Sequence, residues 1–242
     1  MTIYAPDYYR EFECIADKCC HTCCQGWEID VDETSLSRFY KIRDISKYIS
    51  NEGSAHIQLD RNERCPFLRD DGLCRIILDY GEDMLCDICR DHPRFRNYWT
   101  DRIEIGLGMV CESAGRLILS KNKPMCIIKI DGDKSEQDLP EDEQWLMDYR
   151  THLLDSIEEE GPKARLLEYL IYRHIPDALY DGMVEERTAF IFDAYNEIIS
   201  AWAKTDGSMD ALIECVRIFS YTVEYDDEIL VKKISKFSKE ST

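Results

Sequence analysis

The sequence has no long apolar run and no excess of basic residues. No stretch approaches the ~20 apolar residues that a membrane-spanning helix needs, so we expect no membrane partner. The 49 acidic side chains outnumber the 30 basic ones and give a formal net charge of -19, which opposes binding to phosphate backbones. We therefore expect no nucleic-acid partner.

The first residues also lack the features of a secretory signal. Met1–Glu13 is polar and tyrosine-rich, with no basic region followed by an apolar one. The protein is therefore expected to be cytoplasmic, in a compartment where thiols stay reduced and disulfide frameworks are rare.

Cysteine, by contrast, is abundant, with 12 residues in the chain. Five of them lie in one polar segment, CIADKCCHTCC at residues 14–24, in which Lys18, His21 and Thr22 interrupt any apolar face. Buried packing therefore does not explain these thiols. Clustered thiols in a reducing compartment indicate metal ligands, because the thiolate is the metal-binding form.

Thiols further along the chain extend this candidate site. The turn dipeptide at residues 71–72 folds Cys74 back toward Cys65. The i, i+3 spacing of Cys86 and Cys89 in an expected short helix places both sulfurs on one face. The cysteines in such contexts are the predicted metal ligands: Cys14, Cys19, Cys23, Cys24, Cys65, Cys74, Cys86, Cys89 and Cys111.

The sequence leaves the nature of the metal open. These candidates exceed the four ligands of a tetrahedral zinc site, so either two centres exist or some of the cysteines are structural. Thiolate ligands do not distinguish an iron–sulfur cluster from zinc. His21 and His92 are further candidate ligands, Cys20 is a spare thiol, and Cys126 and Cys215 are expected to pack in the core.

The sequence predicts an α+β protein, predominantly helical, in which an irregular cysteine-rich half with short strands docks on a C-terminal helical bundle. Residues 1–130 form the cysteine-rich metal-binding region and residues 131–242 the helical region, within a single compact unit. Apolar positions at helical spacing predict helices over residues 141–159, 184–204 and 209–225, with another helix beginning at Gly161-Pro162.

Shorter elements are expected in the first half. Alternating apolar residues predict a strand at 27–31, and a helix follows it to about residue 51. We expect extended segments at IQLD and CPFL, a helix over residues 111–120, and a short buried strand at MCIIKI.

Several sequence blocks resemble the flagellin lysine N-methylases, a branch of the CxxCxxCC zinc- or iron-chelating domain family. The cysteine-containing blocks are PDYYREFEC, CCQGWEIDVD, RCPFLRDDGLC, GEDMLCDICRDHPRF and CESAGRLIL. The resemblance continues into LLEYLIYRHIPDALYDG and RIFSYTVEYDDEIL and covers most of the chain. The chain departs from the family by being shorter, between Ser120 and Lys163, and by carrying Cys20 where Pro is more common.

The resemblance implies methyl transfer from S-adenosylmethionine to lysine side chains of flagellin, with an iron–sulfur cluster taking part. A cluster that engages S-adenosylmethionine needs three Cys ligands and one open position. The motif CxxxCxxC is absent: if Cys19 and Cys23 were its first two cysteines, the third would be residue 26, which is Gly. Distant segments of the chain therefore have to supply the ligands. No GxGxxG loop supports a Rossmann-type methyltransferase instead.

A second class of function stays open from the sequence. It is a non-enzymatic zinc- or iron-binding protein whose cysteines hold the fold together. The resemblance of the block RIFSYTVEYDDEIL implies a role for Tyr221, Glu224 and Tyr225 in positioning a lysine amine. Their helical spacing, however, favours an amphipathic helix with Glu224 solvated. Arg173 and His174 are candidates for binding a carboxylate or anchoring the cysteine-rich region, but packing between helices is favoured for both.

Overall fold

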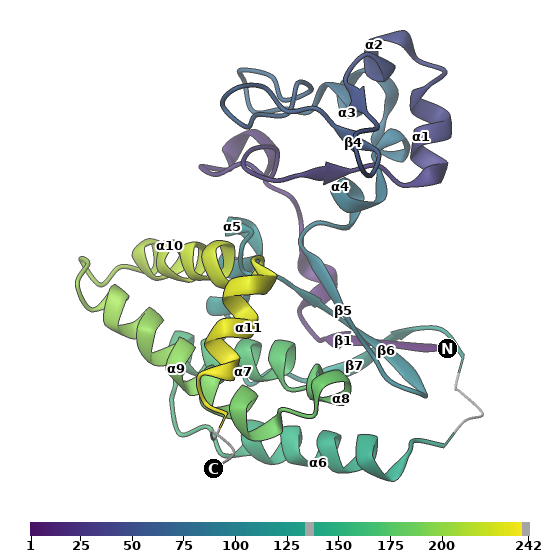
Figure 1. The fold of residues 1–242 in the computed structure, drawn as a ribbon. Helices are drawn as coiled ribbons and strands as arrows, with labels where there is room; N and C mark the ends of the chain where they lie inside the picture. The colour runs from purple at the N-terminus through teal and green to yellow at the C-terminus, as the bar shows by residue number, and fades with distance from the viewer. Residues whose placement is uncertain (134–137, 239–242) are drawn as a thin grey trace. The chain divides into compact units, whose positions relative to one another are not determined.

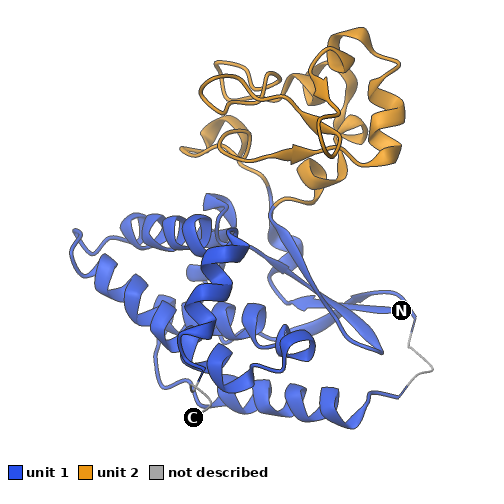
Figure 2. Cartoon of the chain, viewed as in Figure 1, with its two compact units in different colours: residues 1–13, 93–242 blue, residues 14–92 orange. Residues whose placement is uncertain are grey.

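The computed structural model of the chain describes residues 1–133 and 138–238. The chain divides into two compact units, unit 1 (Met1–Glu13 and Pro93–Thr242) and unit 2 (Cys14–His92), as Figure 2 shows. Unit 2 is therefore inserted between two segments of unit 1. The division of the sequence after residue 130 and the docking of its two regions stay predictions.

Unit 1 contains a mixed sheet in the order β5-β6-β1-β7 (Figure 1). β5 and β6 form an antiparallel hairpin, β6 pairs in parallel with β1, and β1 pairs antiparallel with β7. The strands are β1 (Thr2–Pro6), β5 (Arg94–Tyr98), β6 (Arg102–Leu107) and β7 (Ile127–Asp131).

The sequence predicted only the last of these strands, and its expected burial is wrong. β7 is an edge strand with one neighbour, and its residues are exposed or half-buried. Cys126, which precedes β7, was expected to pack in the core, but it is exposed.

Helices make up the rest of unit 1, and the expected helical segments are confirmed with shorter ends. They are η1 (Tyr9–Glu11), α5 (Glu112–Leu119), α6 (Glu141–Asp155), α7 (Gly161–His174), α8 (Ala178–Asp181), α9 (Val184–Trp202), α10 (Met209–Phe219), the π-helical segment η4 (Ser220–Glu224) and α11 (Asp227–Ser235). In the described residues, no helix has both the length and the apolar character to cross a membrane.

The core of unit 1 is built around α7, which is buried on nearly every side. Its side chains Leu166 and Leu170 pack with Phe190 of α9 and Leu212 of α10, all fully buried. Cys215 packs against this core, as expected. The protein is thus α+β and mostly α.

Unit 2 consists of short elements and a small antiparallel sheet in the order β2-β4-β3. Its elements are η2 (Ala16–Lys18), β2 (Ile29–Asp30), α1 (Glu33–Phe39), α2 (Arg43–Ser46), β3 (Ile49–Ser50), β4 (His56–Ile57), α3 (Arg75–Tyr80), η3 (Glu82–Met84) and α4 (Asp87–Asp91).

The helix expected to reach residue 51 is broken. Asp32 caps its start by accepting a hydrogen bond from the Ser35 backbone amide at 2.8 Å. The helix then ends at Phe39, because Ile42 adopts an extended conformation and separates α1 from α2. The CPFL segment forms turns and no strand in the described residues.

Candidate metal centre

Five of the nine predicted ligands lie around the core of unit 2. Cys65 and Cys86 are buried in that core, and Cys24, Cys74 and Cys89 pack against it while partly exposed. We call these five residues the thiol core. They come from three stretches of sequence, so the fold of unit 2 gathers them.

Local backbone pairing places three of these thiols. The Cys65 amide donates to the Cys24 carbonyl at 2.8 Å, and an antiparallel bridge joins the residues beside them. A second bridge pairs Leu68 with Cys74, across the predicted turn in which Gly72 adopts φ 81°. This turn folds Cys74 back toward Cys65, as the sequence indicated.

The ionisation of the thiols is uneven. A hydrogen bond from Cys23 lowers the pKa of Cys24 to about 7, although burial opposes it, whereas burial raises the pKa of Cys65 to about 12. Cys86, the N-cap of α4, accepts a hydrogen bond from Cys89, which lowers the pKa of Cys86 and raises that of Cys89. Within the thiol core, Cys24 and Cys86 are thus the residues with a lowered pKa, which favours the thiolate form that binds a metal.

The chemistry of this donor set fits a metal held by thiolates, as in zinc and iron–sulfur sites. In the described ranges, 1–133 and 138–238, no group of three or more His, Cys, Asp or Glu side chains is arranged to hold a metal ion. Coordination would therefore require three or four of these thiols to approach one another more closely and to bind as thiolates.

The structure places the other four predicted ligands elsewhere. Cys14 and Cys23 are exposed, and Cys19 is half-buried with its thiol donating to the His21 carbonyl. Cys111 belongs to unit 1, where it occupies the N-cap position of α5 without a capping hydrogen bond from its side chain. A role for these four residues as ligands stays a prediction.

A second polar cluster lies in the interior of unit 1; the sequence singled out several of its residues but did not predict that they meet or that Glu224 is buried. The Glu224 carboxylate has 1% exposure, and its Oε1 lies 2.8 Å from Nε2 of His174 and 3.4 Å from Nε of Arg173. Its Oε2 accepts hydrogen bonds from Tyr169 at 2.6 Å and Ser220 at 2.5 Å. We call these five residues the Glu224 network.

The expectation that Glu224 is solvated is therefore wrong. Burial opposes its ionisation, but Arg173 and the hydrogen bond from His174 outweigh burial and lower the pKa of Glu224 to about 2. Both carboxylate oxygens are engaged, so Glu224 is not free to receive a lysine amine. The sequence signal that could have indicated its burial is its position four residues after Ser220 and between Val223 and Tyr225.

Arg173 also lies between two aromatic rings. Its guanidinium carbon is 4.8 Å from the ring centre of Phe95 on β5 and 4.9 Å from that of Tyr225. Such stacking adds to the ion pair with Glu224 and fixes the orientation of the guanidinium plane.

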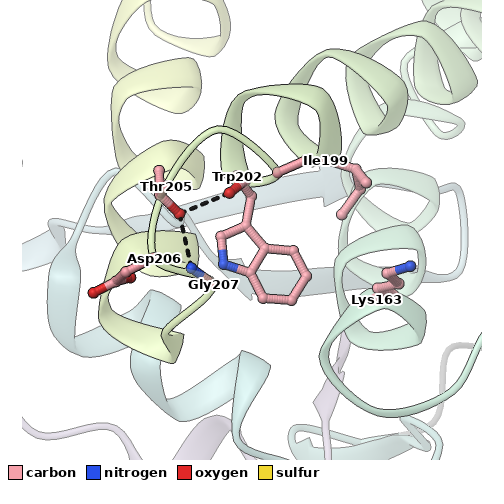
Figure 3. Close-up of a pocket in the computed structure, with 7 residues that line it drawn as sticks. Lys163, Ile199, Trp202, Thr205, Asp206 and Gly207 are labelled. Carbon is pink, nitrogen blue, oxygen red and sulfur yellow. Dashed lines mark hydrogen bonds between the residues drawn. The ribbon is translucent and has the colours of Figure 1, made fainter.

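A surface depression near the end of α9 is lined by Ile199, Trp202, Asp206, Gly207 and Lys163 of α7 (Figure 3). Hydrogen bonds from the Thr205 hydroxyl to the Trp202 carbonyl and from the Gly207 amide to the Thr205 hydroxyl shape it. These contacts close the turn after α9, and none of the predicted ligands lies there.

Comparison with known proteins relates the chain to flagellar and methylase proteins of Salmonella. Flagellar biosynthetic protein FliU of Salmonella muenchen is 22% identical over 139 residues, covering 52% of this chain and 82% of that protein. Lysine-N-methylase of Salmonella typhimurium and that of Salmonella choleraesuis are each 24% identical over 141 residues. The chain is a relative of the lysine-N-methylases.

The relationship covers 52% of this chain but only 35% of each lysine-N-methylase. No family model and no solved structure matches the chain. Membership in the broader CxxCxxCC family therefore stays a prediction.

Proposed function

We propose that this protein methylates lysine side chains of flagellin, with S-adenosylmethionine as methyl donor and an iron–sulfur cluster as cofactor. The relationship to the lysine-N-methylases is the observation that carries the proposal, and the name of the FliU relative supports a flagellar substrate. In the transfer, the S–CH₃ bond of the sulfonium breaks, an N–CH₃ bond forms, and the lysine nitrogen gives up a proton.

The thiol core is the proposed place of the metal in this chain. Cys24 and Cys86 supply the thiolates that form most readily, and Cys65, Cys74 and Cys89 are the further donors around the same core. A bound cluster would supply redox chemistry and, with three protein ligands, an open iron position. The unit's apolar core would exclude water from it.

The test of activity is co-expression with flagellin, followed by intact-mass analysis of the flagellin. We expect mass increments of methyl size with the wild-type chain, none with Cys24→Ala, and unchanged increments with Cys126→Ala, whose thiol is exposed and outside the thiol core. Unmodified flagellin in the presence of metal-loaded wild-type protein would refute the proposed activity.

The second candidate is a non-enzymatic protein with a structural zinc site. The observation that favours it is the burial of Cys65 and Cys86 in the core of a small unit, as expected when a metal holds a fold together. Anaerobic purification separates the two: brown protein with acid-labile sulfide supports the cluster, whereas colourless protein with stoichiometric zinc supports the structural site.

A further inference from the structure

The loop after β6 and the first turn of α5 bond to the two residues of unit 1 that flank unit 2 in the sequence. The Gly108 amide donates to the Pro93 carbonyl at 2.7 Å, and the Ser113 hydroxyl donates to the Glu13 carbonyl at 2.7 Å. Glu13 is the last residue of unit 1 before unit 2, and Pro93 is the first residue after it. Glu13 and Pro93 are therefore bonded to residues that precede and follow Cys111 in the sequence.

The Glu224 network contacts the same loop. The Tyr169 hydroxyl accepts a hydrogen bond from the Met109 amide at 3.2 Å and donates one to the Glu224 carboxylate. The Tyr225 hydroxyl fills the space beside Gly108, since it lies 2.5 Å from the position that a Cβ on Gly108 would occupy. Nη1 of Arg173 lies 3.1 Å from the same position.

Such a network is costly to assemble. Burying Glu224 and Arg173 removes two charges from water, which is unfavourable for each ion before the two are paired. The π-helical segment η4, which carries Glu224, sacrifices regular helical hydrogen bonding, and segments of this kind are frequent at functional sites. Apolar side chains would fill the interior without either cost.

We propose that Tyr169 and Arg173, held by Glu224, and Tyr225, against whose ring Arg173 lies, are positioning residues for the loop at residues 108–111. Through that loop they fix Glu13 and Pro93, the residues of unit 1 that flank unit 2 in the sequence. This placement follows from unit 1 alone. Its consequence for catalysis rests on the proposed function: loosening the loop lowers flagellin methylation without lowering the metal content of the thiol core.

The sharpest test is Gly108→Ala, because the new methyl group collides with the Tyr225 hydroxyl. We expect amide hydrogen exchange in residues 10–13, 94–97 and 106–113 to become about tenfold faster or more. Gly115→Ala is the matched control, since its Cβ meets only ordinary contacts, with Ile213 at 3.6 Å. That variant should exchange like wild type.

Rescue distinguishes positioning from general damage. Gly108→Ala combined with Tyr225→Phe removes the colliding oxygen but leaves the new methyl group 3.1 Å from Nη1 of Arg173 and 3.2 Å from the Pro93 carbonyl oxygen, so protection of the three segments should return in part. Tyr169→Phe is a milder variant that loses the bond to the Met109 amide and should speed exchange at that amide. The proposal is overturned if the double variant is no better protected than Gly108→Ala, or if the Met109 amide is unaffected by Tyr169→Phe.

Metal content and methylation complete the experiment. Gly108→Ala should keep the wild-type ratio of metal to protein and methylate flagellin at least about tenfold more slowly, with recovery in the double variant. Loss of metal in Gly108→Ala would contradict the proposal. Absence of methylation by wild type would refute the proposed function alone, because the exchange results judge the positioning role independently.

Discussion

Acidification should destabilise unit 1 through Glu224. The folded-state pKa of this carboxyl is about 2, against an ordinary value of 4.5. Because the folded value is the lower one, the stabilisation is fully present above pH 4.5 and is lost as the pH falls toward 2. The difference corresponds to about 3 kcal/mol in total, of which about 2 kcal/mol is lost by pH 3.

The assay needs a signal from unit 1 alone. Trp27→Phe removes the indole of unit 2 and leaves Trp99, Trp145 and Trp202, all in unit 1, as fluorescent probes of denaturant unfolding. In this background, the free energy of unfolding is measured from pH 6 to pH 3. We expect a decline that includes the Glu224 contribution of about 2 kcal/mol.

Ser220→Ala isolates that contribution from those of other carboxyl groups. Loss of the Ser220 hydrogen bond moves the pKa of Glu224 toward its ordinary value, so the decline with acidification should shrink by about 1 kcal/mol. Ser156→Ala, which removes a hydroxyl bonded within α6 on the exposed surface, is the control and should decline like the parent. Equal declines in Ser220→Ala and the parent would refute the role assigned to Glu224.

Three further predictions concern metal, a buried ion pair and a helix cap. The Cys65→Ala variant should lose bound metal, as measured by elemental analysis. The Cys215→Ala variant should keep the wild-type metal content, because Cys215 packs against the core of unit 1. Arg150→Met should lower the unfolding free energy by about 3 kcal/mol or more in denaturant melts, because it leaves the buried Glu104 carboxylate unpaired. Ser208→Ala should cost about 1 kcal/mol in the same measurement, because Ser208 caps α10 by accepting from the Ala211 amide.

The helices of unit 1 could be predicted because their signals are local. Gly161-Pro162 marks the start of α7, and apolar spacing along Leu166, Leu167 and Leu170 marks its buried face. The end of α10 was less well predicted. The regular pattern ran to residue 225, whereas the structure changes to the π-helical η4 at Ser220, a segment whose Glu224 accepts a hydrogen bond from Tyr169 of α7.

The sheet could not be predicted in the same way. Ile103, Ile105 and Leu107 of β6 alternate along the strand, but β6 pairs in parallel with β1, from which the whole of unit 2 separates it in sequence. Pro6 in β1 also favoured a turn over a strand, although it lies at the strand's end, where the missing amide is tolerated. Pairing over such a distance leaves little local signal.

The candidate site was predictable only where its residues are close in the sequence. Turn and helix signals brought Cys65 near Cys74 and Cys86 near Cys89, and the structure has both pairs on one core. The Glu224 network joins α7 to η4 across about fifty residues, and neither segment alone shows why its polar side chains are buried.

The thiol core explains a feature of unit 2 that apolar packing leaves open. Units of this size have small cores, and metal binding or disulfides commonly add the stability that burial alone does not supply. Here Cys65 and Cys86 occupy core positions beside Ile57 and Phe67, where Val or Leu would bury more apolar surface. Cysteine is the better residue at these positions if the thiols serve as ligands, because thiolate bonds to a metal then add folding free energy. The same choice of residue would leave unit 2 weakly stable without its metal, whereas unit 1 has a larger core that contains no predicted ligand among its buried side chains.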